Sequence, residues 1–333
     1  MIRNYPWSKR KKLAAYGAGN ALLGLRAVHD LAIDYVIDDT PGYSGQKVDG
    51  LDIYPSSHLK DQNRAELFVL ICANTSAGVF GIARRLLEMG YMPGVDFTDC
   101  SCLQSESMSS RLLEAFQLKT SSFKLNAVRG LSLGLRPRNL STIAGTWLFL
   151  ELLESLPRSV VGSVAECGLY QGANALIASA LSSRLAERPY ALYDSFEGLS
   201  ELSCSDPEAR RGEFADVSMP EVEMLFSGFT NVRIVKGRFE NTMPKEVMRP
   251  HGLVYIDCDL RDPTLFCCRH FWPLLAPGGY LMTHDYWFPE VSLPKGAKLP
   301  FIGVKEAFDI FCDEQEVNPV VFPETSHAVV RKP

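Results

Sequence analysis

The stretch Val161–Ala175, which reads VGSVAECGLYQGANA, decides the fold of the second half of the chain. Its apolar beginning predicts a strand that ends near Glu166, and Gly168 and Gly172 predict a turn that leads into a helix. A glycine turn between a strand and a helix lets bare backbone approach a ligand. The stretch therefore predicts the first strand, turn and helix of a ligand-binding α/β unit.

The next apolar run, Tyr190–Tyr193, ends in Asp194, which is followed by Ser195. An acidic side chain at the tip of the second strand of such a unit is placed to bind the two hydroxyls of a ribose. No Gly-Lys-Ser or Gly-Lys-Thr follows the glycines, so the turn lacks the lysine of a phosphate-binding P-loop. The expected ligand is a nucleoside without a large phosphate load.

The rest of the second half alternates predicted strands with predicted helices. The expected strands lie at 161–166, 191–194, 232–235, 252–257 and 280–283, with two closing strands at 317–322 and 327–331. This alternation predicts an α/β fold, in which a mostly parallel sheet carries helices on both faces. The two closing strands predict an antiparallel hairpin at one edge of that sheet.

The first part of the chain carries a similar pattern on a smaller scale. Lys12–Tyr16 predicts a strand, Gly17–Asn20 predicts a turn, and Asp38 follows the next apolar run. The third glycine of a dinucleotide-binding turn is displaced, so a turn that binds no ligand is the alternative. We expect an α/β domain over residues 1–104, a connector over 105–135 and the larger domain over 136–333.

Composition narrows the classes of function. The chain has 333 residues, of which 46% are hydrophobic and 22% charged, a profile typical of globular proteins. A net charge of −5 gives no electrostatic support to nucleic-acid binding. No run approaches the roughly 20 apolar residues that span a bilayer, and the nine cysteines are scattered without a CxxC pair. We expect a cytoplasmic homo-oligomer with neither a nucleic-acid partner nor a membrane partner.

Five segments of the second half resemble the macrocin O-methyltransferase family, whose members methylate sugar hydroxyls on macrolide and aminocoumarin antibiotics. The segments are VAECGLYQGANA (164–175), YDSFEGLSE (193–201), VRIVKGRFENTMP (232–244), LVYIDCDLRDPT (253–264) and WPLLAPGGYLMTHDYW (272–287). The resemblance implies a class I methyltransferase fold, S-adenosylmethionine as cofactor and a small-molecule or glycan acceptor. The positions that it assigns to the cofactor pocket are Glu166, Gly168, Gly172, Asp194, Ser195, Gly237 and Glu240.

A second chemical site follows the predicted strand 252–257. Asp257 ends this strand, Asp259 lies two positions further, and the next strand ends in His284 and Asp285. Carboxylates gathered at one sheet edge suit Mg²⁺. In the resembling family a divalent metal binds through positions matching Asp257, His284 and Asp285, but here a histidine replaces the family's second acid. We expect Mg²⁺ on Asp257, Asp259 and Asp285, with Asp257 and His284 as catalytic residues, and His284 as an alternative base.

The first domain resembles the Rossmann-like sugar-nucleotide-binding modules attached to bacterial glycan-modifying enzymes. The shared segments are YGAGN (16–20), VIDDTPGYSGQKVDGLDIYPSSHL (36–59) and LLEMGY (86–91). This resemblance implies a nucleotide sugar as a ligand of the first domain.

Two other functions stay open on the sequence alone. Asp257-Cys258-Asp259 also fits the DxD metal site of a sugar-nucleotide glycosyltransferase, although that reading leaves the glycine turn before Asn174 unexplained. The histidine at position 284 keeps open a binding or scaffold protein whose methyltransferase half has lost activity. We expect an O-methyltransferase that acts on a sugar or a glycosylated small molecule.

Overall fold

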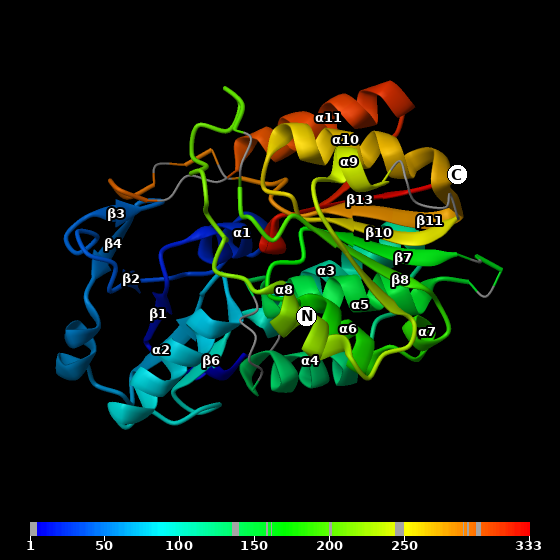
Figure 1. The fold of residues 1–333 in the computed structure, drawn as a ribbon. Coiled ribbons are helices and arrows are strands. Elements are labelled where there is room, and N and C mark those ends of the chain that lie inside the picture. Colours follow the sequence, from blue (N-terminus) through cyan, green and yellow to red (C-terminus); the bar gives the residue numbers. More distant parts are fainter. Residues whose placement is uncertain are drawn as a thin grey trace.

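The structure is a computed structural model, and two α/β units follow one another along the chain, each built on its own sheet (Figure 1). It describes residues 5–134, 140–157, 159–160, 162–199, 202–243, 250–288, 290–291, 293–297 and 301–333. Among these residues, no helix combines the length and the apolar character that crossing a membrane requires.

The first sheet has six strands in the order β3-β4-β2-β1-β5-β6. Its strands are β1 (Lys12–Tyr16), β2 (Tyr35–Ile37), β3 (Lys47–Val48), β4 (Leu51–Tyr54), β5 (Leu67–Ile71) and β6 (Phe97–Asp99). Neighbouring strands are parallel except β3 and β4, which form a small antiparallel pair. Helix α1 (Asn20–Val28) follows β1, and α2 (Ser76–Glu88) follows β5.

The second sheet has seven strands in the order β12-β13-β11-β10-β7-β8-β9. They are β7 (Ser163–Cys167), β8 (Tyr190–Asp194), β9 (Val232–Lys236), β10 (His251–Ile256), β11 (Leu275–Thr283), β12 (Val320–Phe322) and β13 (His327–Arg331). The strands from β9 to β11 run parallel, and β13 pairs antiparallel with both β11 and β12. The predicted α/β fold with an antiparallel edge hairpin is confirmed.

Helices cover both faces of the second sheet (Figure 1). They are α5 (Ile143–Ser155), α6 (Ala173–Leu181), α7 (Ser183–Ala186), α8 (Met219–Phe226), α9 (Phe239–Thr242), α10 (Arg261–Phe271) and α11 (Ile302–Gln315). Thr142 caps α5, because its side chain accepts a hydrogen bond of 2.9 Å from the N–H of Gly145. Helices α10 and α11 lie on one face, and α5 and α6 lie on the other.

The segment that we expected to be a connector is mainly helical. It holds most of α3 (Ser101–Phe116) and all of α4 (Ser122–Gly134). The expected boundary between residues 135 and 136 lies outside the described residues.

The two units share a hydrophobic core. One cluster of buried side chains contains Tyr16 and Ile71 from the first sheet and Trp147, Val164 and Tyr255 from the second unit. Because buried apolar area stabilises the folded state in proportion to its extent, this shared core stabilises the packing of one unit against the other.

Polar contacts join the units at the turn between β12 and β13, which includes the short helix η5 (Pro323–Thr325). Glu324 is 1% exposed, and its backbone oxygen accepts a hydrogen bond of 2.7 Å from Gln104. Its carboxylate lies 3.0 Å from the guanidinium of Arg111. A buried carboxylate needs such a partner, so this contact fixes α3 against the end of the second sheet.

Candidate functional site

The glycine turn between β7 and α6 lies against the neighbouring strand end. Gly168 has a φ of 86°, a left-handed conformation that side chains rarely adopt. A Cβ at this position would overlap the backbone carbonyl oxygen of Asp257. The glycine is therefore required for the close approach of β7 to β10, and it leaves the top of the turn open to a ligand.

Asp194 at the end of β8 holds this turn in place. Its Oδ2 accepts hydrogen bonds from the N–H groups of Leu169 at 2.8 Å and Tyr170 at 2.9 Å, and its Oδ1 accepts one from Phe196 at 2.7 Å. Burial raises the pKa of the Asp194 carboxyl, and the backbone hydrogen bonds partly oppose this rise. Asp194 thus organises the turn as well as lining the cavity described below.

Glu166 lies in β7, two residues before Gly168, and is 1% exposed. Its carboxyl hydrogen-bonds the hydroxyl of Tyr190, the first residue of β8. Burial raises the pKa of Glu166 to about 8, although the hydrogen bond from Tyr190 opposes the shift. The side chain points into the protein interior, and Glu166 is not among the residues that line the cavity.

The turn after β9 approaches the same place from the neighbouring strand. Gly237 has a φ of 135°, and its N–H donates a hydrogen bond of 2.9 Å to the backbone oxygen of Asp194. Glu240 follows in α9. Both residues line the cavity, as does Ser195.

A cluster of three titratable side chains lies where β10 and β11 end. His284 Nδ1 is 3.2 Å from Asp257 Oδ1 and 3.3 Å from Asp285 Oδ2. One ligand atom from each of these residues lies within 4.8 Å of the others, and this is the group of potential metal ligands that the described part of the chain offers. Asp259 lies nearby but outside the group. Both Asp259 (φ 60°) and Asp285 (φ 53°) have left-handed backbones, a strained conformation that is common at functional sites.

His284 is held between two negative charges. Burial alone would lower its pKa, but the charges of Asp285 and Asp257 and the hydrogen bonds to both raise the pKa of His284 well above its usual value. The imidazole therefore keeps its proton at neutral pH. A protonated imidazole cannot accept a proton, so the raised pKa does not favour the predicted role of His284 as an alternative base.

Two buried side chains support the cluster from below. The hydroxyl of Tyr255 donates a hydrogen bond of 3.1 Å to Asp257 Oδ2 and lies 3.3 Å from His327 Nε2. The rings of His327 and His284 have centroids 4.6 Å apart. Burial and then the charge of His284 hold the pKa of His327 well below its usual value, so His327 is the neutral member of this pair.

These elements enclose a cavity of about 410 Å³ at the carboxyl edge of the second sheet. Nine of the eleven predicted site residues line it: Gly168, Asp194, Ser195, Gly237, Glu240, Asp257, Asp259, His284 and Asp285. Gly172 and Glu166 do not. Gly172 (φ 79°) instead precedes α6, where a Cβ would come within 3.1 Å of the Phe226 ring.

Two lining residues that were not predicted from the sequence come from the other unit. Asn74 and Thr75 follow β5 of the first sheet, yet they border the cavity of the second. Their position after a buried parallel strand could have marked them, because ligands bind at the carboxyl ends of such strands. Nothing in the sequence indicated that the two edges meet.

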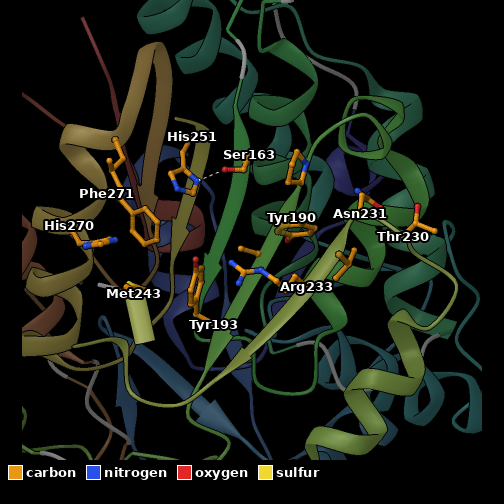
Figure 2. Close-up of a pocket in the computed structure, with 14 residues that line it drawn as sticks. Ser163, Tyr190, Tyr193, Thr230, Asn231, Arg233, Met243, His251, His270 and Phe271 are labelled. Carbon is orange, nitrogen blue, oxygen red and sulfur yellow. Dashed lines mark hydrogen bonds between the residues drawn. The ribbon is translucent and has the colours of Figure 1, made fainter. Parts of the chain in front are cut away.

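A different cavity, of about 400 Å³, lies toward the amino ends of β7 to β10 (Figure 2). Ser163 Oγ and His251 Nδ1 are 2.9 Å apart there, and burial lowers the pKa of His251 to about 4. Figure 2 shows Tyr190 and Tyr193 of β8 and Phe271 of α10 around this space. None of the predicted site residues lines it. The carboxyl edge therefore carries the candidate site.

Residues 150–293 match the model of one protein family, Macrocin-O-methyltransferase (TylF). The resemblance that the sequence indicated is confirmed over this segment, which includes strands β7 to β11. The first unit lies outside the match.

Similar proteins include two methyltransferases that are each 25% identical. One is the 8-demethyl-8-(2,3-dimethoxy-alpha-L-rhamnosyl)-tetracenomycin-C 4'-O-methyltransferase of Streptomyces olivaceus, with 45% of this chain and 65% of that protein aligned. The other is the mycinamicin III 3''-O-methyltransferase of Micromonospora griseorubida, with 44% of this chain and 67% of that protein aligned.

Similar solved structures include the O-methyltransferase NovP, with 18% identity over 70% of this chain and 99% of that one, and a TM-score of 0.48. The calicheamicin methyltransferase CalS11 has 20% identity over 68% of this chain and 91% of that one, and a TM-score of 0.48.

Proposed function

We propose, on the premise that residues 150–293 belong to the macrocin O-methyltransferase family, that the chain transfers a methyl group from S-adenosylmethionine to a sugar hydroxyl. The observation that carries this proposal is the cavity at the carboxyl edge of the second sheet. It brings a glycine turn, a strand-end acid and an Asp-His-Asp cluster to one place. A nucleoside cofactor and a reacting hydroxyl therefore have adjacent binding groups.

The cofactor is assigned to the side of the cavity formed by β7, β8 and β9. Gly168 presents bare backbone there, and the carboxylate of Asp194 is placed to accept hydrogen bonds from the ribose hydroxyls. Ser195 and the turn from Gly237 to Glu240 border the space next to that ribose. Glu166 and Gly172 act from outside the cavity, by holding the strand and the helix start between which the turn lies.

The acceptor is assigned to the side formed by the ends of β10 and β11. The methyl group of a sulfonium is already activated, so the protein must align the hydroxyl oxygen with it and remove the hydroxyl proton. Asp257 accepts this proton in our proposal. His284 carries a positive charge between Asp257 and Asp285, which fixes the position of both carboxylates and favours negative charge on the acceptor oxygen.

A divalent ion would be held by Asp257 and Asp285. Two carboxylates fit Mg²⁺, which prefers oxygen ligands, but the protonated His284 cannot coordinate it, and its Nδ1 already hydrogen-bonds both carboxylates. When bound, the ion would lower the pKa of the acceptor hydroxyl as a Lewis acid. We therefore propose Mg²⁺ as a weakly bound assistant, and Asp259 as a residue that reaches it through water.

The acceptor class is proposed from the names of the relatives and from the walls of the cavity. One similar methyltransferase is named for a rhamnosyl-bearing tetracenomycin and the other for mycinamicin III. Phe214 and Phe301 line the cavity, with ring centroids 6.4 Å apart. Aromatic rings at a cavity wall suit the apolar face of a sugar. A glycosylated small molecule or a nucleotide sugar is the acceptor that fits.

Calorimetric titration with S-adenosylhomocysteine tests the cofactor assignment without knowledge of the acceptor. We expect wild-type protein to bind it, and Asp194→Asn to bind at least about tenfold more weakly, because a charged hydrogen bond to each ribose hydroxyl is lost. Asp38→Asn in the first sheet is the matched control and should bind as wild type does. Wild-type protein that shows no binding would contradict the proposed function.

A further inference from the structure

We propose that the first unit holds the nucleoside of a ribonucleoside diphosphate sugar, whose sugar reaches the Asp-His-Asp cluster of the second unit. The inference rests on the proposed methyl transfer for the role of the sugar. We infer the nucleoside site itself from the first sheet, from a cavity at its edge and from one residue that borders both cavities.

The two sheets have the same strand order around the glycine turn. The five strands β4-β2-β1-β5-β6 correspond to β9-β8-β7-β10-β11, and all neighbouring pairs within both sets are parallel. Strand β1 therefore has the place of β7, β2 the place of β8 and β5 the place of β10. In such sheets a ligand binds beyond the carboxyl ends of the strands, where the order reverses.

The glycine turns that follow β1 and β7 make similar contacts. Gly17 follows β1 with a φ of 118°, and its N–H donates a hydrogen bond of 2.8 Å to the backbone oxygen of Ile37 at the end of β2. A Cβ on Gly17 would overlap the carbonyl oxygen of Cys72, just as one on Gly168 would overlap that of Asp257. Both turns are pressed against the strand at the same position for the same steric reason.

The acids at the ends of β2 and β8, Asp38 and Asp194, also accept similar hydrogen bonds. Asp38 follows β2, and its carboxylate accepts hydrogen bonds of 2.8 Å from the N–H groups of Ala18 and Thr40. Asp194 accepts the same two kinds of bond, one from its glycine turn and one from the residue two positions further along the chain. Asp38 is thus held in the orientation that we assign to a ribose-binding carboxylate.

A cavity of about 470 Å³ lies at this edge of the first sheet. Asp38 and Tyr43 line it, and so does Arg85, which pairs with Asp39. The place of the catalytic Asp257 is taken by Cys72, which is 1% exposed. The first cavity has the elements for binding a nucleoside but no carboxylate at the reacting position, so its role is binding alone.

Asn74 connects the two cavities. It lines the cavity of the first sheet and also the cavity that contains Asp257 and His284. Its Oδ1 accepts a hydrogen bond of 2.6 Å from the N–H of Ala21 in the first turn of α1, so it is fixed at the border. A ligand that has its nucleoside beside Asp38 can therefore pass Asn74 and place its other end at the cluster.

A nucleoside diphosphate sugar is the ligand class that uses all of these features. Its ribose hydroxyls match Asp38, and its sugar carries the hydroxyl to be methylated. Its diphosphate suits the guanidinium of Arg85, which lines the first cavity, and the amino end of α1. A second molecule of an adenosine-containing cofactor would also match Asp38. It would not explain why the two cavities meet at Asn74.

The test is a calorimetric titration of the full chain that is first saturated with S-adenosylhomocysteine. The probes are UDP, GDP, CDP and ADP, followed by the 2'-deoxy form of whichever binds most tightly. We expect at least one ribonucleotide to bind without displacing S-adenosylhomocysteine. We expect its deoxy form to bind about tenfold more weakly or worse, since one hydrogen bond to a carboxylate is lost.

Two variants locate the site. Asp38→Asn should weaken nucleotide binding about tenfold or more and leave S-adenosylhomocysteine binding unchanged, whereas Asp194→Asn should do the reverse. Ile82→Trp fills the cavity without touching the turn, and it decides the question if Asp38→Asn disturbs folding. Competition between nucleotide and S-adenosylhomocysteine, or no binding by any of the four nucleotides at about 5 mM, would overturn the inference. Neither result would affect the binding of S-adenosylhomocysteine alone, on which the proposed function depends.

Discussion

The replacement Glu166→Gln should change how the stability of the protein depends on pH. Burial raises the pKa of Glu166 from 4.5 to about 8, so the folded protein keeps this carboxyl protonated at pH values where the unfolded chain releases the proton. The stabilising contribution is fully present below pH 4.5 and is lost as the pH rises toward 8. Between pH 5.5 and 7.5 the loss amounts to about 2.5 kcal/mol of unfolding free energy. A glutamine cannot ionise, so the variant lacks this loss.

Urea unfolding of both proteins at half-unit steps of pH measures the effect. The difference in unfolding free energy between Glu166→Gln and wild type should rise with pH by about 2.5 kcal/mol across this range. All other titrating groups are common to both proteins, so their contributions cancel. Glu187→Gln, at an exposed position, is the matched control for the substitution itself. Parallel curves for Glu166→Gln and wild type would refute the argument, because they would mean that Glu166 is ionised in the folded protein.

Three further predictions concern the turn and the cluster. Gly168→Ala should lower the unfolding free energy by at least about 1 kcal/mol in urea titrations, because alanine is strained in the left-handed region and its Cβ meets the carbonyl of Asp257; an unchanged midpoint would exclude this packing. Asp257→Asn should reduce methyl transfer about 100-fold or more while S-adenosylhomocysteine affinity stays within about threefold, as calorimetry would show; near wild-type turnover would place the proton acceptor elsewhere. With EDTA present, wild type should keep residual transfer that millimolar Mg²⁺ stimulates. The residual rate of wild type should stay constant around neutral pH and decrease only as the pH passes the raised pKa of His284. In His284→Gln this decrease should be absent. A wild-type rate that instead increases through about pH 6.5 would make His284 a base.

The sequence was sufficient for the fold of the second unit because its strands are apolar and end in glycine or acid. The runs before Asp194 and Asp257 predicted β8 and β10 to within one or two residues. The expected strand at 280–283 covers only the end of β11. The structure begins β11 at Leu275 and includes Pro277–Gly279 in it, because pairing with β10 resumes after an irregularity that the sequence does not reveal.

The sequence predicted only those site residues whose position depends on the end of a single strand. The cavity-lining positions Asp194, Asp257 and His284 follow from the rule that ligands meet the carboxyl ends of parallel strands. The interior position of Glu166 did not follow, because a residue in a buried strand can face either a cavity or the core, and only the hydrogen bond to Tyr190 decides it. The contribution of Asn74 depends on the packing of two units, which no local pattern encodes.

The central claim is that the carboxyl edge of the second sheet transfers a methyl group to a sugar hydroxyl. The most direct measurement incubates the protein with S-adenosylmethionine labelled in its methyl group and a panel of nucleotide sugars and glycosides, with Asp257→Asn in parallel. We predict labelled sugar product from wild type and at most about one hundredth as much from the variant. Binding of S-adenosylhomocysteine without label transfer to any sugar in the panel, or equal transfer by both proteins, would contradict the account.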